Sequence, residues 1–242
     1  MHQFTRVAWA SAAAQAVWET RLRTVSTTWF DVELASVREG LREAALVFGQ
    51  ERVLASRLPA VQVAPDRFAV GPKAADLANR YAANDDDGVG RLLGFPPCCR
   101  EFFRTHWGKT DLTLAMTGTP RATASNVLGR WLGVRLVPHL PCSWDCAATA
   151  RMAAQWARLW PGVDSCWPWA VEFVQWPVRY SSLHGIAIVT WPVVKVVTNV
   201  EGPRYESVER HIDVHGYTYP DEAPVGLSFP FVRPVPLLTL TR

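Results

Sequence analysis

The first quarter of the chain carries apolar residues at helical spacing. Within residues 8–58 these positions include Trp29, Val32, Leu34, Val37, Leu41, Ala45 and Leu46. This period places one apolar stripe on one face of a helix, so the pattern predicts helices that bury that face. The Ala-rich start of the chain is interpreted as an amphipathic helix rather than a signal peptide, because Gln15 interrupts its apolar residues.

Strand patterns follow in two places. Residues 60–72, AVQVAPDRFAVGP, alternate on either side of Pro65-Asp66 and predict a short hairpin. Residues 73–160 return to helical pieces broken by glycine and proline, whereas Val, Ile, Thr and Tyr dominate after Pro161. Together these patterns predict an α+β fold in which mainly helical N-terminal two-thirds are followed by a smaller, mostly antiparallel C-terminal sheet.

Composition narrows the class of protein. The 242 residues are 49% hydrophobic and 19% charged, which predicts a single globular unit over 1–242, with sub-lobes at 1–160 and 161–242. The net charge of +3 contains no block of like charges, so neither nucleic acid nor an acidic membrane is expected as a partner. No run of about 18 apolar residues is present, and we expect no membrane span and a cytoplasmic location.

Four of the five cysteines fall in two close pairs. Cys98 and Cys99 are neighbours behind two prolines, and some 40 residues later HLPCSWDC carries Cys142, Cys146 and His139. In a reducing compartment an odd number of cysteines is poorly explained by structural disulfides. The grouping therefore predicts a shared metal site, with the four sulfurs converging within roughly 7 Å.

Both pairs are predicted to lie at helix starts. Pro96-Pro97 suits the beginning of a helix that contains the first pair, and Ser143 is the expected N-cap of a helix after the second. The unpaired N–H groups at a helix start favour thiolates and can hold an anionic metal–sulfur cluster. The pairs therefore occupy positions where thiolates are stabilised.

The adjacency of Cys98 and Cys99 bears on the kind of metal. Neighbouring helical side chains diverge by about 100°, which is awkward for one tetrahedral zinc ion but suits the separated irons of an iron–sulfur cluster. The sequence thus favours an iron–sulfur cluster, with zinc as the alternative. Cys98 is expected to point away from Cys99 and to be the replaceable ligand. Buried thiols without metal and a metal-free dithiol redox pair remain further alternatives.

Two resemblances accompany these motifs. The adjacent pair followed by a second close pair is similar to the cysteine-rich domain of the heterodisulfide-reductase type, which holds iron–sulfur clusters, although Arg100 stands where that motif has glycine and the second pair is C-x3-C instead of C-x2-C. LLGFPPCCREFF and NVLGRWLGVRLVPHLPCSWDC resemble the GFPxCCxxFF and HxPCSxxC blocks of a poorly characterised prokaryotic family. The second resemblance implies no reaction.

The leading functional hypothesis is an iron–sulfur enzyme that performs redox or sulfur chemistry on a small molecule. His139 and Cys98 are its candidate catalytic residues, because His139 lies beside the centre and Cys98 is the expected replaceable ligand. Arginines near the two blocks are candidates for binding an anionic substrate: Arg100, Arg104, Arg130 and Arg135. A zinc-stapled binding module is the rival hypothesis.

Other polar residues give weaker patterns. Cys166 has no partner in sequence and is predicted to be buried, and His106 is predicted to pack in the core or to line a pocket. The strand-like HIDVH places His211, Asp213 and His215 on one face, as a second metal site or an exposed polar face. The acidic NDDDGVG, residues 84–90, is interpreted as a solvated turn.

Overall fold

The computed structural model describes residues 6–9, 11–109, 112–118, 125, 133–160 and 166–174, together with the backbone of 178–181, 186–189 and 193–197. The described helices are α1 (Ala12–Arg38), α2 (Gln50–Ser56), α3 (Ala74–Ala82), α4 (Asp86–Leu92), α5 (Pro97–His106), α6 (Leu112–Ala115), α7 (Ala147–Trp156) and α9 (Trp167–Phe173). The strands are β1 (Arg6–Trp9), β2 (Ala45–Phe48), β3 (Ala60–Ala64), β4 (Arg67–Val70), β5 (Val178–Ser181), β6 (Ile186–Val189) and β7 (Val193–Val197).

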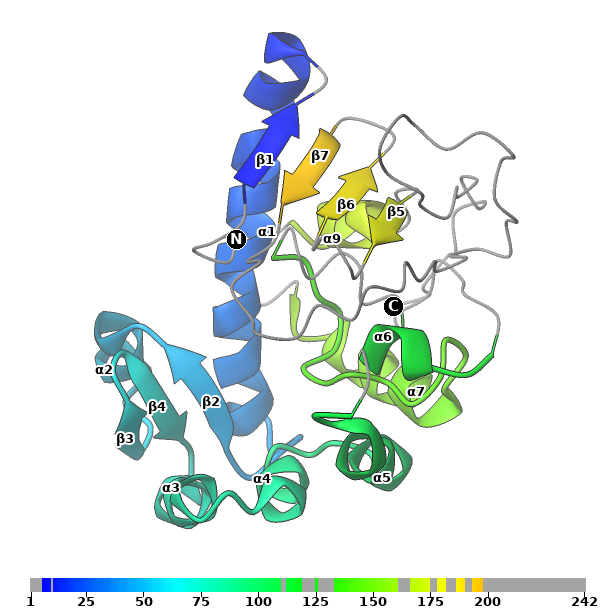
Figure 1. Cartoon of the computed structure of the whole chain (residues 1–242). Coiled ribbons are helices and arrows are strands. Elements are labelled where there is room, and N and C mark those ends of the chain that lie inside the picture. Colours follow the sequence, from blue (N-terminus) through cyan, green and yellow to red (C-terminus); the bar gives the residue numbers. More distant parts are fainter. Residues whose placement is uncertain are drawn as a thin grey trace.

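Helix α1 is the long axis of the described structure. It begins where the Ser11 side chain accepts a hydrogen bond from the Ala14 N–H, and it ends at Arg38, two residues before Gly40, whose φ of 67° lies in the left-handed region. Leu22, Val25 and further residues at helical spacing are fully buried. The helix runs past both sheets (Figure 1). The predicted helical stripe is therefore confirmed as far as Arg38.

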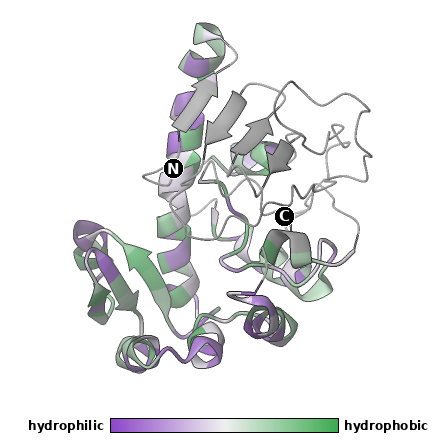
Figure 2. Cartoon of the chain, in the orientation of Figure 1, coloured by the Kyte–Doolittle hydropathy of each residue, from purple (hydrophilic) through white to green (hydrophobic). Residues whose placement is uncertain are grey.

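A three-stranded antiparallel sheet follows α1, in the order β2-β4-β3. Its β3–β4 hairpin, with Asp66 at a φ of 54° in the turn, confirms the hairpin expected around Pro65-Asp66. Ala45 and Leu46, however, belong to β2 and not to a helix. Apolar residues dominate β2 (Figure 2), and a run this short fits a strand as well as a helical turn.

The predicted fold class is wrong because of this sheet. Residues 45–70 form it in the middle of the region expected to be helical, so the chain does not divide into helices first and a sheet last. The second sheet also mixes the two regions, since N-terminal β1 pairs with β7 in the order β1-β7-β6-β5. The described part is a mainly helical fold with a small central sheet. Residues 198–242 lie outside the described part.

The largest hydrophobic cluster joins α1 to α7 and α9. Trp29 stacks on Trp156 with ring centroids 5.3 Å apart, and Trp160 lies 6.2 Å from Trp29. All three indoles are at most 2% exposed. Burying such large side chains provides most of the packing between these helices. These tryptophans are core residues and do not form a binding surface.

A buried ion pair lies beside this cluster. The Arg42 guanidinium lies 3.8 Å from the Glu33 carboxylate, donates to the Glu33 carbonyl at 3.0 Å, and stacks over the Trp156 ring at 4.8 Å. Burial raises the pKa of Glu33 and lowers that of Arg42 to about 10, while the opposite charge of each partner offsets these shifts. The pair thus holds two charges inside the core.

Candidate metal centre

The first half of the centre lies at the start of α5. Pro96 is the N-cap and Pro97 the first helical residue, so Cys98 and Cys99 occupy the first turn, as the sequence predicts. Gly94 makes this possible at the preceding turn: its φ is 75°, and a Cβ there would lie 3.1 Å from the Arg42 side chain. The loop therefore passes close to the core before α5 begins.

The second half lies in the turn before α7. The Cys146 N–H donates to the Ser143 carbonyl at 3.4 Å, and Cys146 itself is the N-cap of α7. Ser143 was the expected N-cap, and that prediction is wrong because the turn carries the chain through buried Trp144 before the helix begins. The residue before α7 is thus a cysteine whose sulfur lies beside those of Cys98 and Cys99.

Thr117, in the segment after α6, holds this turn in place by backbone hydrogen bonds. The Thr117 N–H donates to the Cys142 carbonyl at 3.3 Å, and the Trp144 N–H donates to the Thr117 carbonyl at 2.9 Å. Thr117 and Ser143 form an isolated parallel bridge. These backbone hydrogen bonds of Thr117 therefore hold Cys142 in place independently of its sulfur atom.

The four sulfurs converge. The Sγ atoms of Cys98, Cys99, Cys142 and Cys146 all lie within 4.8 Å of one another. The Cys146 sulfur lies 3.7 Å from that of Cys99 and 3.8 Å from that of Cys98, and the two neighbouring sulfurs are 3.9 Å apart. The predicted convergence is confirmed, and the cluster could bind a metal.

The expectation that Cys98 diverges from the other three is wrong. The sulfurs of the two neighbours lie 3.9 Å apart at the helix start, because side-chain rotation lets adjacent residues direct their thiols to the same side. What distinguishes Cys98 is exposure, since it is exposed whereas Cys99 and Cys146 are buried. Cys98 is therefore the solvent-facing member of the cluster. Its sulfur lies 3.8 Å from that of Cys146, and the Cys99 sulfur lies 3.7 Å from it.

Burial and hydrogen bonding shift the pKa values of three of these thiols in different directions. Burial raises the pKa of Cys99, and burial with a hydrogen bond to Cys146 raises that of Cys142 to about 11. Burial also acts to raise the pKa of Cys146, but hydrogen bonds with Thr149 and the neighbouring cysteines outweigh it and lower this pKa to about 7. Burial therefore opposes ionisation of Cys99 and Cys142, and a bound cation would offset this cost.

His139 joins the centre through Thr149. The Thr149 hydroxyl lies 3.6 Å from the Cys99 sulfur and 2.9 Å from His139 Nε2. His139 is 7% exposed, and burial lowers its pKa to about 4, so the ring is neutral at pH 7. Its Nδ1 has no hydrogen-bond partner, and its ring packs on Phe95 with centroids 5.4 Å apart.

Replacing Thr149 by valine is expected to lower the free energy of unfolding by about 1–3 kcal/mol. Valine keeps the shape of threonine but removes the hydroxyl between Cys99 and His139, which leaves both ring nitrogens of His139 unpaired. Urea unfolding measures the loss. Thr149→Ser retains the hydroxyl and serves as the control, and a valine variant as stable as the serine variant would contradict the bridging role.

The remaining candidate residues have structural partners or lie elsewhere. Cys166 is 1% exposed within the main core, which confirms its predicted burial. The ring of His106 packs on Phe102 at 4.6 Å and its Nδ1 lies 2.9 Å from the Phe102 carbonyl, in agreement with a packing role. Some residues lie outside the described part of the chain: Arg130, His211, Asp213 and His215.

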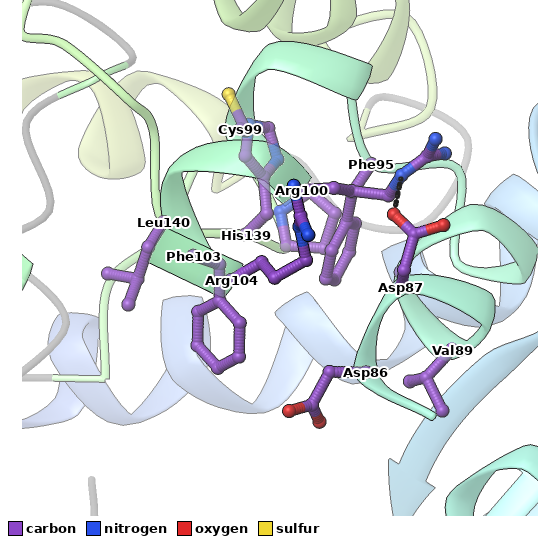
Figure 3. Close-up of a pocket in the computed structure, with 12 residues that line it drawn as sticks. Asp86, Asp87, Val89, Phe95, Cys99, Arg100, Phe103, Arg104, His139 and Leu140 are labelled. Carbon is purple, nitrogen blue, oxygen red and sulfur yellow. Dashed lines mark hydrogen bonds and ion pairs between the residues drawn. The ribbon is translucent and has the colours of Figure 1, made fainter. Parts of the chain in front are cut away.

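A pocket with a volume of about 260 Å³ adjoins the centre. It is lined by α4, by α5 and by the loop 138–140, and Cys99 and His139 are among its lining residues (Figure 3). The sequence does not reveal this pocket, because residues 84–90 read as a solvated turn whereas most of them form α4. Thr149 was missed as well, since nothing in its sequence context marks it as a partner of His139.

Comparisons of the chain with protein-family models, with curated proteins and with solved structures find no match. The resemblance to a prokaryotic family through the two cysteine blocks therefore stays a prediction. Among the helices that the structure describes, none combines the length and the hydrophobicity needed to cross a membrane.

Proposed function

We propose that the four cysteines bind one zinc ion, which joins α5 to the turn before α7. The observation that carries this proposal is the sulfur spacing. Four bonds of about 2.3 Å directed to tetrahedral corners place neighbouring sulfurs about 3.8 Å apart. The three distances among Cys98, Cys99 and Cys146 are 3.7–3.9 Å. The donor set therefore suits a single tetrahedral ion.

The same distances favour zinc over the iron–sulfur cluster expected from the sequence. The cysteine sulfurs around a four-iron cluster are about 6 Å apart, because each binds a different iron. All four sulfurs here lie within 4.8 Å. The iron–sulfur assignment rested on the divergence of Cys98 from Cys99, and this divergence is absent.

A site closed by four thiolates stabilises the fold and offers no coordination position to a substrate. Cys99 and Cys146 are 47 residues apart in sequence, and their ligation would hold together two segments otherwise separated by a long stretch of chain. We therefore infer a structural zinc site in a binding module. The catalytic roles suggested for Cys98 and His139 stay predictions that this geometry does not require.

Metal analysis of the purified protein tests the proposal. One equivalent of zinc in a colourless protein is the expected result, because zinc has a filled d shell. Protein purified under anaerobic conditions that contains several irons and acid-labile sulfide, with a brown colour, would overturn it in favour of the iron–sulfur cluster.

Lowering the pH is expected to release the metal. Zinc should stay bound at pH 7.5 and leave below about pH 5, because protons compete with the ion for the cysteine sulfurs. A colorimetric zinc indicator follows the release while circular dichroism reports the fold at each pH. Zinc content that does not change down to about pH 4 would contradict ligation by thiolates.

A further inference from the structure

The pocket beside the centre has a buried end and an open end. Cys99 and His139, which are 2% and 7% exposed, line the buried end. Asp86 and Asp87, at the start of α4, are exposed at the open end. Figure 3 shows Cys99 and Asp86 at opposite sides of the group of lining residues. A ligand that fills the pocket would therefore span from the histidine to the aspartates.

The walls between these ends are largely apolar and include two aromatic rings. Phe95 packs against the His139 ring, and Phe103 stacks on Trp107 with centroids 4.8 Å apart, so both rings are held in place. Val89 of α4 and Leu140 of the opposite loop add aliphatic surface. A flat aromatic body suits such walls because it can stack on rings that are already fixed.

The two arginines of the pocket are already in ion pairs. Arg100 donates to Asp87 at 3.0 Å, and Arg104 donates to Glu101 at 2.6 and 2.8 Å. Within the described structure Asp86 forms no ion pair. The mouth of the pocket therefore offers a ligand one uncompensated carboxylate, whereas the two guanidinium charges are neutralised by their own partners.

At the buried end the direction of the hydrogen bonds can be deduced, and this step rests on the proposed metal ligation of Cys99. A metal-bound thiolate only accepts hydrogen bonds, so the single proton of the Thr149 hydroxyl points to sulfur. Thr149 must then accept from His139, which places the ring proton on Nε2. Nδ1 is left as a buried acceptor without a partner.

We propose that this pocket binds a flat aromatic or heteroaromatic amine or amidine, with its ring against the apolar walls and its cationic N–H group at Asp86. The pocket supplies both contacts, since Phe95 and Phe103 line its walls and the exposed Asp86 lies at its mouth. An anionic ligand would face the Asp86 carboxylate, and the two arginines of the pocket are already held by carboxylates of the chain.

Benzamidine and benzoate form a matched pair of probes for this proposal, since they share size and shape but differ in charge and donors. Titration of the full-length, metal-loaded protein, followed by NMR of the protein, should give a dissociation constant for benzamidine about tenfold below that for benzoate. Asp86→Asn should weaken benzamidine binding by about threefold, because the lost ion pair is partly exposed.

Val89→Phe blocks the pocket from α4, away from the cysteines, and should abolish benzamidine binding. Val17→Phe introduces the same change at an α1 residue that is 46% exposed and should bind as the unmodified chain does. Equal affinity for the two probes, or undiminished binding to the Val89→Phe variant, would overturn the pocket proposal.

Zinc content measured on the same samples separates this proposal from the metal site. Stoichiometric zinc without a preference for benzamidine refutes the pocket ligand alone. A benzamidine preference that depends on Val89 supports the pocket whatever the metal content, whereas missing zinc refutes the structural metal site.

Discussion

Replacing Cys146 by serine is expected to strip zinc from the protein and to lower its melting temperature by about 10 °C or more, since structural zinc supplies several kcal/mol of folding free energy. Cys146 is buried and its sulfur lies within 3.8 Å of those of Cys98 and Cys99. Its loss leaves three thiols crowded together without the cation that would hold them as thiolates. Elemental analysis and thermal unfolding measure the two effects.

Cys166→Ser is the matched control for this variant. Cys166 is 1% exposed in the main core and takes no part in the cluster, so its replacement should retain zinc. Cys98→Ser distinguishes the two interpretations of the exposed ligand. Zinc loss equal to that of Cys146→Ser indicates that all four cysteines are required ligands. Retained zinc would instead support the sequence-based expectation that Cys98 is replaceable.

Replacing Arg42 by methionine is expected to lower the free energy of unfolding at pH 7 by about 3–5 kcal/mol. Methionine keeps much of the aliphatic packing, but Glu33 keeps only the more distant charge of Arg135 and the Trp156 ring loses the stacked guanidinium. Urea unfolding measures the change. Glu33→Gln in the Arg42→Met background removes the uncompensated charge and should recover part of the loss.

The pH dependence of this recovery follows from Glu33. Burial raises the pKa of Glu33 in the folded protein, so neutral Glu33 favours the folded state. This contribution to stability is fully present below the pKa of Glu33 in the unfolded chain. It is lost as the pH rises through the pKa of Glu33 in the folded protein. Glu33→Gln should therefore stabilise the Arg42→Met protein at pH 7 and have little effect near pH 4. A benefit that is the same at both values would show that the Glu33 charge is not responsible.

The cysteine grouping was predictable because its signals are local. Two prolines mark the start of α5, and close spacing within each pair keeps its sulfurs together wherever the helices lie. The choice between one ion and a cluster was not predictable, because it depends on side-chain rotation at Cys98. Sequence spacing constrains the backbone positions of neighbouring ligands but not the point at which their sulfurs meet.

The central sheet and the pocket could not be predicted from the sequence, for a different reason. Ala45 and Leu46 continue an apolar spacing that α1 begins, and only pairing with β4 assigns them to a strand. Asp86 and Thr149 acquire their roles from residues distant in sequence, since the pocket joins α4 to the loop of His139. Such roles arise from tertiary packing, which a local pattern does not encode.

The pairing of β1 with β7 has a consequence for synthesis on the ribosome. Arg6 pairs with Val197, so β1 leaves the ribosome long before its partner strand β7. At about 5–20 residues per second, β1 waits roughly 10–40 s with its backbone hydrogen-bonding groups exposed. During this interval an exposed strand edge can pair with another nascent chain. Neighbouring nascent chains on one polysome are therefore close enough for their β1 strands to pair with each other before β7 is made.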